Sequence, residues 1–206
     1  QMIRDAAATL KKVSMELGGN APVIIYDDAD LESCLNAAVP TKFANAGQVC
    51  VTPDRFFVHE SIHDAFVKGF VARTAALKLG DGLDPSVQMG PLINGDRLRE
   101  IEGIVADAAQ HGARVAHGGT RVEGSERGHF FHPTVLTDVT DGMRVFEQEN
   151  FGPIAAITRF SSDDEVLARA NSSEMGLSAY AFTTSAKRIR RTVAELKAGM
   201  VGINSF

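Results

Sequence analysis

The chain has 206 residues, 44% of them hydrophobic, which is long enough for one large domain with its own core. Its 21 basic and 26 acidic residues give a formal net charge of −5, and this balance argues against nucleic acid as a partner because phosphate binding needs a clustered basic face. No apolar run approaches the roughly 20 residues that cross a bilayer, so we expect no membrane partner. Two cysteines are too few for a disulfide framework and favour a reducing, cytoplasmic location.

Short apolar runs alternate along the chain with segments of helical periodicity. In chain order the predicted elements are helix 2–12, strand 13–17, strand 22–26, helix 31–45, strand 55–59, helix 61–79, helix 96–111, strand 114–116, strand 130–139, strand 154–160, helix 163–171, strand 179–183, helix 185–196 and strand 200–204. Strands and helices that alternate in this way form βαβ units. We therefore predict one α/β domain over residues 1–206, a largely parallel, twisted open sheet with helices on both faces.

Local signals set several boundaries. The acidic run 27–30 is expected to cap the helix 31–45, and Pro40 is expected to kink or interrupt that helix. Cys34 falls on the apolar face of the same helix and is predicted to fill the core. The glycine-rich segment 118–128 is predicted to be a mobile surface hairpin or loop.

A second cysteine follows a glycine turn, in the segment Phe43-Ala44-Asn45-Ala46-Gly47-Gln48-Val49-Cys50. The glycine lets the backbone turn sharply, which would bring the Cys50 thiol to the surface of the turn. A lone cysteine is more often a buried small hydrophobe. From this residue alone, a nucleophile and a core filler therefore both remain open.

Two carboxylates lie beside glycine turns of their own. Glu16, between Met15 and Leu17 and just before two glycines, would be odd as a solvated surface residue, and it suits a general base that serves a thiol nucleophile. Its alternative is a buried structural carboxylate paired with a backbone amide. Glu149 precedes a Gly-Pro turn and is the second candidate, with an exposed acidic turn as its alternative.

The segment from His59 to His63 matches H-E-x-x-H, the zinc protease pattern. That site needs both histidines on one face of a continuous helix and a third ligand. Here His59 ends a predicted strand and Ser61 is expected to cap the next helix, so the imidazoles point apart and we predict no metal site. The chain also has neither G-x-G-x-x-G nor G-x-x-x-x-G-K-[ST], the dinucleotide and triphosphate cradles.

Taken together, these motifs resemble those of the NAD(P)-dependent aldehyde dehydrogenase family. Residues 15–20, Met-Glu-Leu-Gly-Gly-Asn, resemble its glutamate signature, and residues 43–50, with an N-x-G-Q-x-C core, resemble its cysteine signature. Residues 149–153 resemble its cofactor-contacting turn. Residues 90–93 and 199–204 also fit, so the resemblance covers essentially the whole chain.

The resemblance implies a mechanism in which Cys50 attacks an aldehyde to give a thiohemiacetal. Its backbone N–H shares the oxyanion with an asparagine outside this chain. Hydride passes to NAD or NADP, and Glu16 activates the water that hydrolyses the resulting thioester.

The resemblance also assigns binding roles. It places the nicotinamide ribose on Glu149, the ring near Phe151, and the carboxamide side of the nicotinamide near Leu17 and Gly18. It lines the substrate end with four residues: Gln48, Val49, Val51 and Phe206.

Because the chain starts at Gln1 and stops at Phe206 without polar tapering, we expect it to be an excised piece. The resemblance implies the catalytic domain alone, with the NAD-binding domain before it, an oligomerisation segment after it, and a homo-oligomer as the complete form. We expect the isolated piece to be inactive.

The overall pattern resembles that of the succinate-semialdehyde dehydrogenase branch, but two positions depart from it. That branch commonly has a substrate-binding arginine where this chain has Ala44, and some members have a second cysteine where this chain has Thr52. Two alternatives are kept. One is a CoA-acylating dehydrogenase, against which Glu16 argues, and the other is a non-catalytic structural or binding domain in which Cys50 is a core filler.

Overall fold

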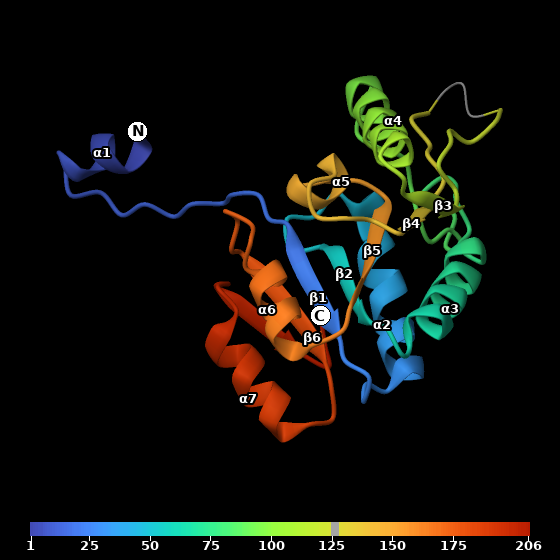
Figure 1. Ribbon diagram of the computed structural model, residues 1–206. Coiled ribbons are helices and arrows are strands. Elements are labelled where there is room, and N and C mark those ends of the chain that lie inside the picture. The colour runs from blue at the N-terminus through green and yellow to red at the C-terminus, as the bar shows by residue number, and fades with distance from the viewer. Residues whose placement is uncertain (125–127) are drawn as a thin grey trace.

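The computed structural model describes residues 1–124 and 128–206, and a seven-stranded sheet lies at the centre of these residues (Figure 1). The strand order is β3-β4-β5-β2-β1-β6-β7. The strands are β1 (Ala21–Ile25), β2 (Pro53–His59), β3 (Arg114–His117), β4 (Thr134–Thr137), β5 (Ile154–Phe160), β6 (Ser178–Phe182) and β7 (Met200–Ile203). Edge strand β3 runs antiparallel to β4, and the other described pairs are parallel. The largely parallel open sheet predicted from the sequence is confirmed.

Helices cover both faces of this sheet. They are α1 (Met2–Ala7), α2 (Leu31–Phe43), α3 (His63–Ala75), α4 (Gly95–Gln110), α5 (Arg144–Glu147), α6 (Asp163–Ala170) and α7 (Ala186–Glu195), with a short 3₁₀ turn, η1 (Ala44–Gly47), after α2. Figure 1 shows α2 and α3 on one side of the sheet and α6 and α7 on the other. Right-handed crossovers require this, because the chain steps toward the β3 edge from β1 to β3 and then steps back across the sheet from β3 to β7.

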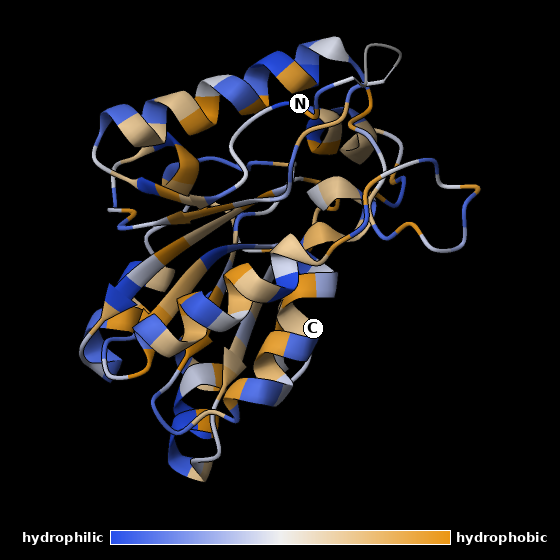
Figure 2. Ribbon diagram, turned by 90° about the vertical axis from the view of Figure 1, so that its right-hand side faces the viewer, coloured by the Kyte–Doolittle hydropathy of each residue, from blue (hydrophilic) through white to orange (hydrophobic). Residues whose placement is uncertain are grey.

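Aromatic side chains fill both layers of the core. Phe56 of β2 points to the α3 face, where its ring centroid lies 6.2 Å from Phe66 and 5.2 Å from Phe70. Its neighbour Phe57 points the other way and lies 5.5 Å from Phe146 of α5. This alternation is the period of two that a strand buried on both faces requires. Figure 2 shows the corresponding hydrophobic colouring along the inner strands.

Four local predictions were wrong. Pro40 lies inside α2, which continues to Phe43, because a proline near a helix end loses only one backbone hydrogen bond. The α3 helix begins after Ile62 and not after Ser61, and it ends at Ala75. Helix α5 was not predicted, since four residues are too few to show a period. The segment 130–139 contains only the short strand β4.

The opening segment differs most from its prediction. Helix α1 is only six residues long and buries none of them, and residues 13–17 form no strand. They remain an exposed arm that extends away from the sheet (Figure 1), because no described strand lies beside them to pair with. The predicted loop 118–128 lies partly outside the described residues, so its mobility stays a prediction.

Candidate active site

The cysteine turn, residues 43–53, connects α2 to β2. Asn45, Ala46 and Gly47 have φ values of 50°, 55° and 71°, three successive residues in the left-handed region. That region is uncommon for residues with a Cβ, and it persists only where surrounding contacts impose it. The Asn45 side chain donates to the Gln48 carbonyl at 3.0 Å, and the Gln48 N–H donates to the Asn45 carbonyl at 3.1 Å. Cys50 follows in the same turn and is partly exposed.

Gly19 brings the three sequence motifs together at one point. A Cβ on Gly19 would overlap the carbonyl oxygen of Cys50, so only glycine allows this close approach. The Gly19 N–H donates to Oε1 of Glu149 at 2.9 Å, and the Glu149 carboxylate lies against Gly18. In the glutamate signature, Gly19 therefore contacts the cysteine turn, and both Gly18 and Gly19 contact the Glu149 carboxylate. The alternative of a freely exposed acidic turn does not describe Glu149, which is half-buried.

The Glu149 turn also packs directly on the cysteine turn. A Cβ on Gly47, at φ 71°, would overlap the carbonyl oxygen of Gly152. Arg97 of α4 holds the other side of this turn, donating to the carbonyl oxygens of Asn150 and, at 3.2 Å, Phe151. Its guanidinium lies 6.0 Å from the Phe151 ring centroid. Phe151 itself has φ 42°, so the turn that presents this ring is also locally strained.

The side-chain amide of Gln48 fixes the position of the loop that follows Gly90. Its Oε1 accepts from the Ile93 N–H at 2.9 Å, and its Nε2 donates to the Asn45 carbonyl at 2.9 Å and the Pro91 carbonyl at 3.4 Å. A hollow of about 420 Å³ lies beside this contact, lined by Asn45, Gln48, Pro91, Leu92, Ile93 and Phe151. Residues 48, 91–93 and 151, which are far apart in the sequence, thus share one surface.

Tyr180 of β6 supports the far end of the cysteine turn. Its hydroxyl donates to the Val51 carbonyl at 2.8 Å. Burial is the main cause that raises the pKa of the Tyr180 phenol, and charge at the nearby Cys50 adds to it. The Phe206 ring packs 4.8 Å from the Tyr180 ring, which places Phe206 in the same neighbourhood. Val49 and Val51 are both partly buried.

Glu16 does not have the environment expected from the sequence. It is exposed, and its carboxylate makes no hydrogen bond or ion pair within the described residues. Leu17 is 60% exposed, and Gly18 is also at the surface. The expectation that flanking apolar residues would exclude water from Glu16 was wrong, because those residues lie on the exposed arm.

The two cysteines differ sharply in environment. Cys34 is fully buried on the inner face of α2, as predicted, and burial raises the pKa of its thiol to about 12. Cys50 is partly exposed at the end of a strained turn. A solvent-reachable thiol can be alkylated or acylated, whereas a buried one resists reaction.

The histidines of the H-E-x-x-H pattern lie on different elements. His59 ends β2 and its Nδ1 contacts the Ser61 hydroxyl at 2.8 Å, whereas His63 begins α3 and its Nδ1 lies 3.0 Å from Asp64. Within residues 1–124 and 128–206, no group of three or more metal-ligating side chains comes together.

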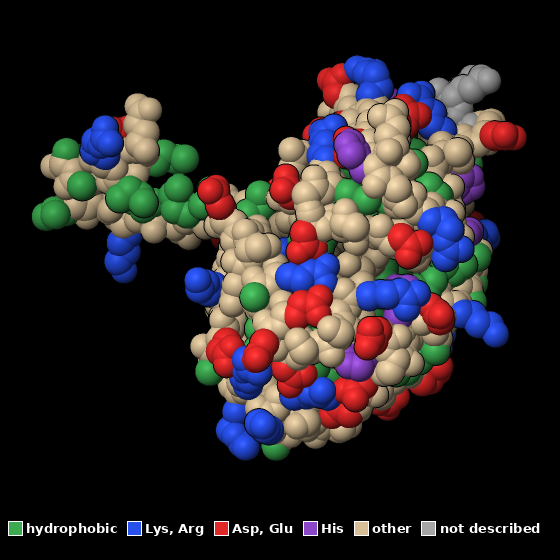
Figure 3. Space-filling view, in the orientation of Figure 1, with side chains coloured by type: hydrophobic (Ala, Val, Ile, Leu, Met, Phe, Trp, Pro, Cys, Tyr) green, Lys and Arg blue, Asp and Glu red, His purple; other side chains and the backbone are tan. Residues whose placement is uncertain are grey.

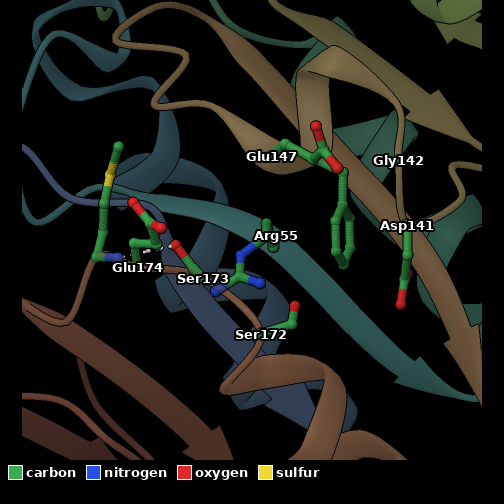
Figure 4. Close-up of a pocket in the computed structure, with 9 residues that line it drawn as sticks. Arg55, Asp141, Gly142, Glu147, Ser172, Ser173 and Glu174 are labelled. Atoms are coloured by element: carbon green, nitrogen blue, oxygen red, sulfur yellow. Dashed lines mark hydrogen bonds between the residues drawn. The ribbon is translucent and has the colours of Figure 1, made fainter.

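A second hollow, of about 530 Å³, lies beneath α5 (Figure 4). Arg55 forms part of its wall and is only 1% exposed. Arg55 donates to the carbonyl oxygens of Asn20 at 3.1 Å and Ala170 at 3.0 Å, and burial lowers its pKa to about 10. These bonds tie β2 to the residue after the glycine pair and to the end of α6. Arg55 thus holds the scaffold behind the cysteine turn.

Sequence reasoning missed four residues that hold these motifs in place: Lys42, Asp54, Arg97 and Tyr180. Each is a single residue outside any short pattern, and its contact is made across the fold. The only signal in the sequence is that Lys42 and Asp54, one basic and one acidic residue, flank the cysteine turn.

Comparison with known proteins places the whole chain in one family. The family model described as "Aldehyde dehydrogenase family" matches residues 1–206. The chain belongs to the aldehyde dehydrogenase family. The resemblance found in its motifs is therefore confirmed.

Two curated members of the family illustrate how close the relationship is. A probable NADP⁺-dependent succinate-semialdehyde dehydrogenase of Sinorhizobium fredii is 46% identical over 99% of this chain, which covers 41% of that protein. A 3-sulfolactaldehyde dehydrogenase of Pseudomonas putida is 45% identical over 99% of this chain, covering 42% of that protein. The chain thus spans about two fifths of the length of these relatives.

A solved structure shows the same architecture. An NADP-dependent enzyme of E. coli superimposes with a TM-score of 0.94 at 42% identity, covering 99% of this chain and 42% of that one. Among the helices described here, none is long and apolar enough to cross a membrane.

Proposed function

We propose that this chain is the thiol-bearing catalytic domain of a longer NAD(P)-dependent aldehyde dehydrogenase that oxidises an aldehyde to a carboxylic acid. The observation that carries the proposal is the junction at Gly19, where the backbone that follows Glu16, the Cys50 carbonyl and the Glu149 carboxylate meet. Covalent aldehyde oxidation needs a nucleophile, a base and a cofactor anchor within one small volume.

In the proposed reaction, the Cys50 thiolate forms a bond to the aldehyde carbon. The Cys50 backbone N–H is one donor to the oxyanion, and such a donor stabilises the transition state by about 3 to 4 kcal/mol. When bound, NAD(P) supplies the hydride acceptor that converts the thiohemiacetal into a thioester. Glu16 then takes a proton from the water that releases the acid and regenerates the thiol. The exposed arm would carry Glu16 to this water.

The residues around the Glu149 turn fit the nicotinamide end of such a cofactor. One Glu149 oxygen accepts from Gly19, and the other makes no hydrogen bond within the described residues, so it is available for a ribose hydroxyl. Phe151 borders the adjacent hollow. We therefore propose Glu149 and Phe151 as cofactor contacts, with Leu17 and Gly18 on the carboxamide side.

The substrate class we propose is a semialdehyde or another small aldehyde with an anionic group. Support comes from the names of two relatives, which act on succinate semialdehyde and on 3-sulfolactaldehyde. Ala44 is exposed and cannot supply the positive charge that the succinate branch places there, so another residue must hold the anionic group. We propose that the substrate end of the site is lined by Gln48, Val49, Val51 and Phe206. Gln48 contributes by holding the backbone of residues 91 and 93 in place.

The partners proposed are a NAD-binding domain of the same polypeptide and further copies in a homo-oligomer. The first is supported by the two-fifths coverage of the relatives and by the absence of a glycine-rich phosphate cradle in the sequence. A cytoplasmic location is also part of the proposal, supported by two free thiols.

Replacing each cysteine in turn tests the proposal. In the complete polypeptide, Cys50→Ala should abolish aldehyde oxidation while cofactor binding survives, because only the covalent step is lost. Cys34→Ala is the matched control and should retain turnover, since Cys34 is a buried core residue. Turnover by Cys50→Ala above about one hundredth of the parent rate, well beyond the loss expected for a nucleophile, would remove Cys50 from this role. The structural-domain alternative predicts no difference between the two variants.

A further inference from the structure

A fully buried ion pair closes the base of the cysteine turn. Lys42, in the last turn of α2, places its Nζ 2.7 Å from Oδ1 of Asp54, the second residue of β2. Their side chains are 0% and 2% exposed. The entire cysteine turn, residues 43–53, lies between these two residues.

Stability alone does not explain this pair. Removing two charges from water costs as much as their attraction returns, and apolar replacements of buried pairs are often neutral or stabilising. The best-attested benefit of such a pair is that it selects one arrangement of the chain over others. Here the selected arrangement is the meeting of the end of α2 with the start of β2.

The turn between them needs such a constraint. Asn45 and Ala46 hold left-handed conformations that residues with a Cβ rarely adopt, and these persist only when neighbouring contacts fix the ends. Thr52 adds a second tie at the same place. Its hydroxyl lies 3.4 Å from the carbonyl oxygens of both Thr41 and Lys42, at the end of α2, where carbonyl groups lack helical partners.

We propose that Lys42 and Asp54 are positioning residues for Cys50. By pinning both ends of the cysteine turn, the pair keeps residues 45–47 in their strained form and so sets where the thiol is presented. The inference deepens the proposed function and rests on it for the kinetic part of the test, whereas the structural part can be measured without turnover.

Hydrogen exchange in the complete polypeptide tests the structural part. In Lys42→Met/Asp54→Leu, which removes both charges together, amide exchange in residues 43–53 should accelerate at least tenfold. The Gln48 and Thr52 N–H groups, bonded within the turn, report it directly. Exchange in β1 and β5 should stay within twofold. A general loss of stability would instead accelerate exchange in all three regions.

The kinetic part should separate kcat from KM. A reacting group displaced by about 1 Å can lose about 10²-fold in rate, so we expect kcat to fall at least tenfold while the KM for the aldehyde stays within twofold. The matched control is Glu32→Gln/Arg73→Met. It removes the 2.5 Å ion pair between Glu32, in the first turn of α2, and Arg73, in the last turn of α3. It should leave both kcat and exchange in 43–53 unchanged.

The proposal is overturned if the apolar double variant folds and shows parental exchange in 43–53 and parental kcat. If that variant does not fold, Asp54→Asn decides, because its amide oxygen still accepts from Lys42 while the opposite charge is gone. Selective tenfold effects in Asp54→Asn support the positioning role. Unchanged values, or failure of this variant to fold as well, make the pair merely structural. Should Cys50→Ala keep its turnover, the proposed function fails but the exchange result remains interpretable.

Discussion

At the residue scale, the main contrast is between the two thiols. Both are single cysteines in or just beyond the same helix, and their sequence surroundings do not state which is reactive. Helical spacing correctly predicted that Cys34 points into the core. For Cys50, the glycine turn predicted a presented thiol, but the left-handed conformation of Ala46 in this turn has no sequence signal.

We predict that only Cys50 reacts in the native chain. Iodoacetamide at pH 8 should modify one thiol quickly and the second only after unfolding, because burial raises the pKa of Cys34 to about 12 and shields it. Peptide mapping after labelling identifies the site. Rapid native labelling at Cys34, or protection at Cys50, would contradict the assignment.

Glu16 leads to a second prediction at this scale. In the complete polypeptide, Glu16→Gln should lower steady-state turnover by roughly 10² or more, the usual size of general-base catalysis, while a pre-steady-state burst of reduced cofactor persists. The burst survives because acylation of Cys50 does not require the water-activating base. Stopped-flow absorbance measures both phases. If the burst disappears together with turnover, Glu16 instead serves to activate Cys50. If the enzyme is CoA-acylating, Glu16→Gln should leave turnover unchanged.

At the element scale, the sequence predicted what short-range periodicity controls. The expected strand over residues 154–160 coincides with β5, and Asp30 caps α2 by accepting from the Ser33 N–H at 3.1 Å. Contacts across the fold were not predictable. The antiparallel edge strand β3, the short α5 and the ties made by Lys42, Arg97 and Tyr180 depend on which segments meet.

Tyr180 provides the element-scale prediction, because it links β6 to the cysteine turn. In the complete polypeptide, Tyr180→Phe leaves the Val51 carbonyl without its hydroxyl donor. A hydrogen bond of this kind contributes about 1 kcal/mol, so Tm should fall by about 1 °C, because the entropy of unfolding grows with the length of the complete polypeptide. We also expect kcat to fall by about threefold to tenfold, since 1.4 kcal/mol of lost positioning corresponds to tenfold.

The chain's other tyrosine is the natural control. Tyr26→Phe removes a buried hydroxyl that lies 3.0 Å from the Thr192 hydroxyl, on α7 and away from Cys50. Its Tm should fall by a similar amount while kcat stays the same. Equal kcat losses in the two variants would mean that Tyr180 acts through stability alone.

At the scale of the whole molecule, the exposed arm, residues 1–18, is the part that buries the fewest of its apolar side chains. Its apolar side chains face solvent: Met2, Ile3, Leu10, Val13, Met15 and Leu17 are between 38% and 95% exposed. Figure 3 shows such side chains gathered on the arm, whereas charged groups of both signs are dispersed over the body. The alternation of Val13, Met15 and Leu17 is the pattern that predicted a strand. The pattern is present, but no described strand lies beside these residues, so they do not form one.

We predict that the 206-residue chain by itself folds but neither binds NAD tightly nor oxidises aldehyde. It carries Glu149 and Phe151 for the nicotinamide end but no glycine-rich turn for the pyrophosphate. Its exposed apolar arm should promote self-association. Calorimetry and sedimentation measure both. Micromolar NAD binding by the isolated chain would show that the cofactor site lies within these residues and that the proposed division between domains is wrong.

The most direct test of the proposed chemistry is to trap the acyl group on Cys50. The complete polypeptide carrying Glu16→Gln is mixed with excess NADP and an aldehyde such as succinate semialdehyde, quenched in acid, and digested for mass spectrometry. The peptide that contains Cys50 should gain the mass of the corresponding acyl group, because the thioester forms but hydrolyses slowly. The peptide with Cys34 should remain unmodified. A reaction that produces reduced cofactor while Cys50 stays unmodified, or that acylates another residue, would contradict the assignment of Cys50 as the nucleophile.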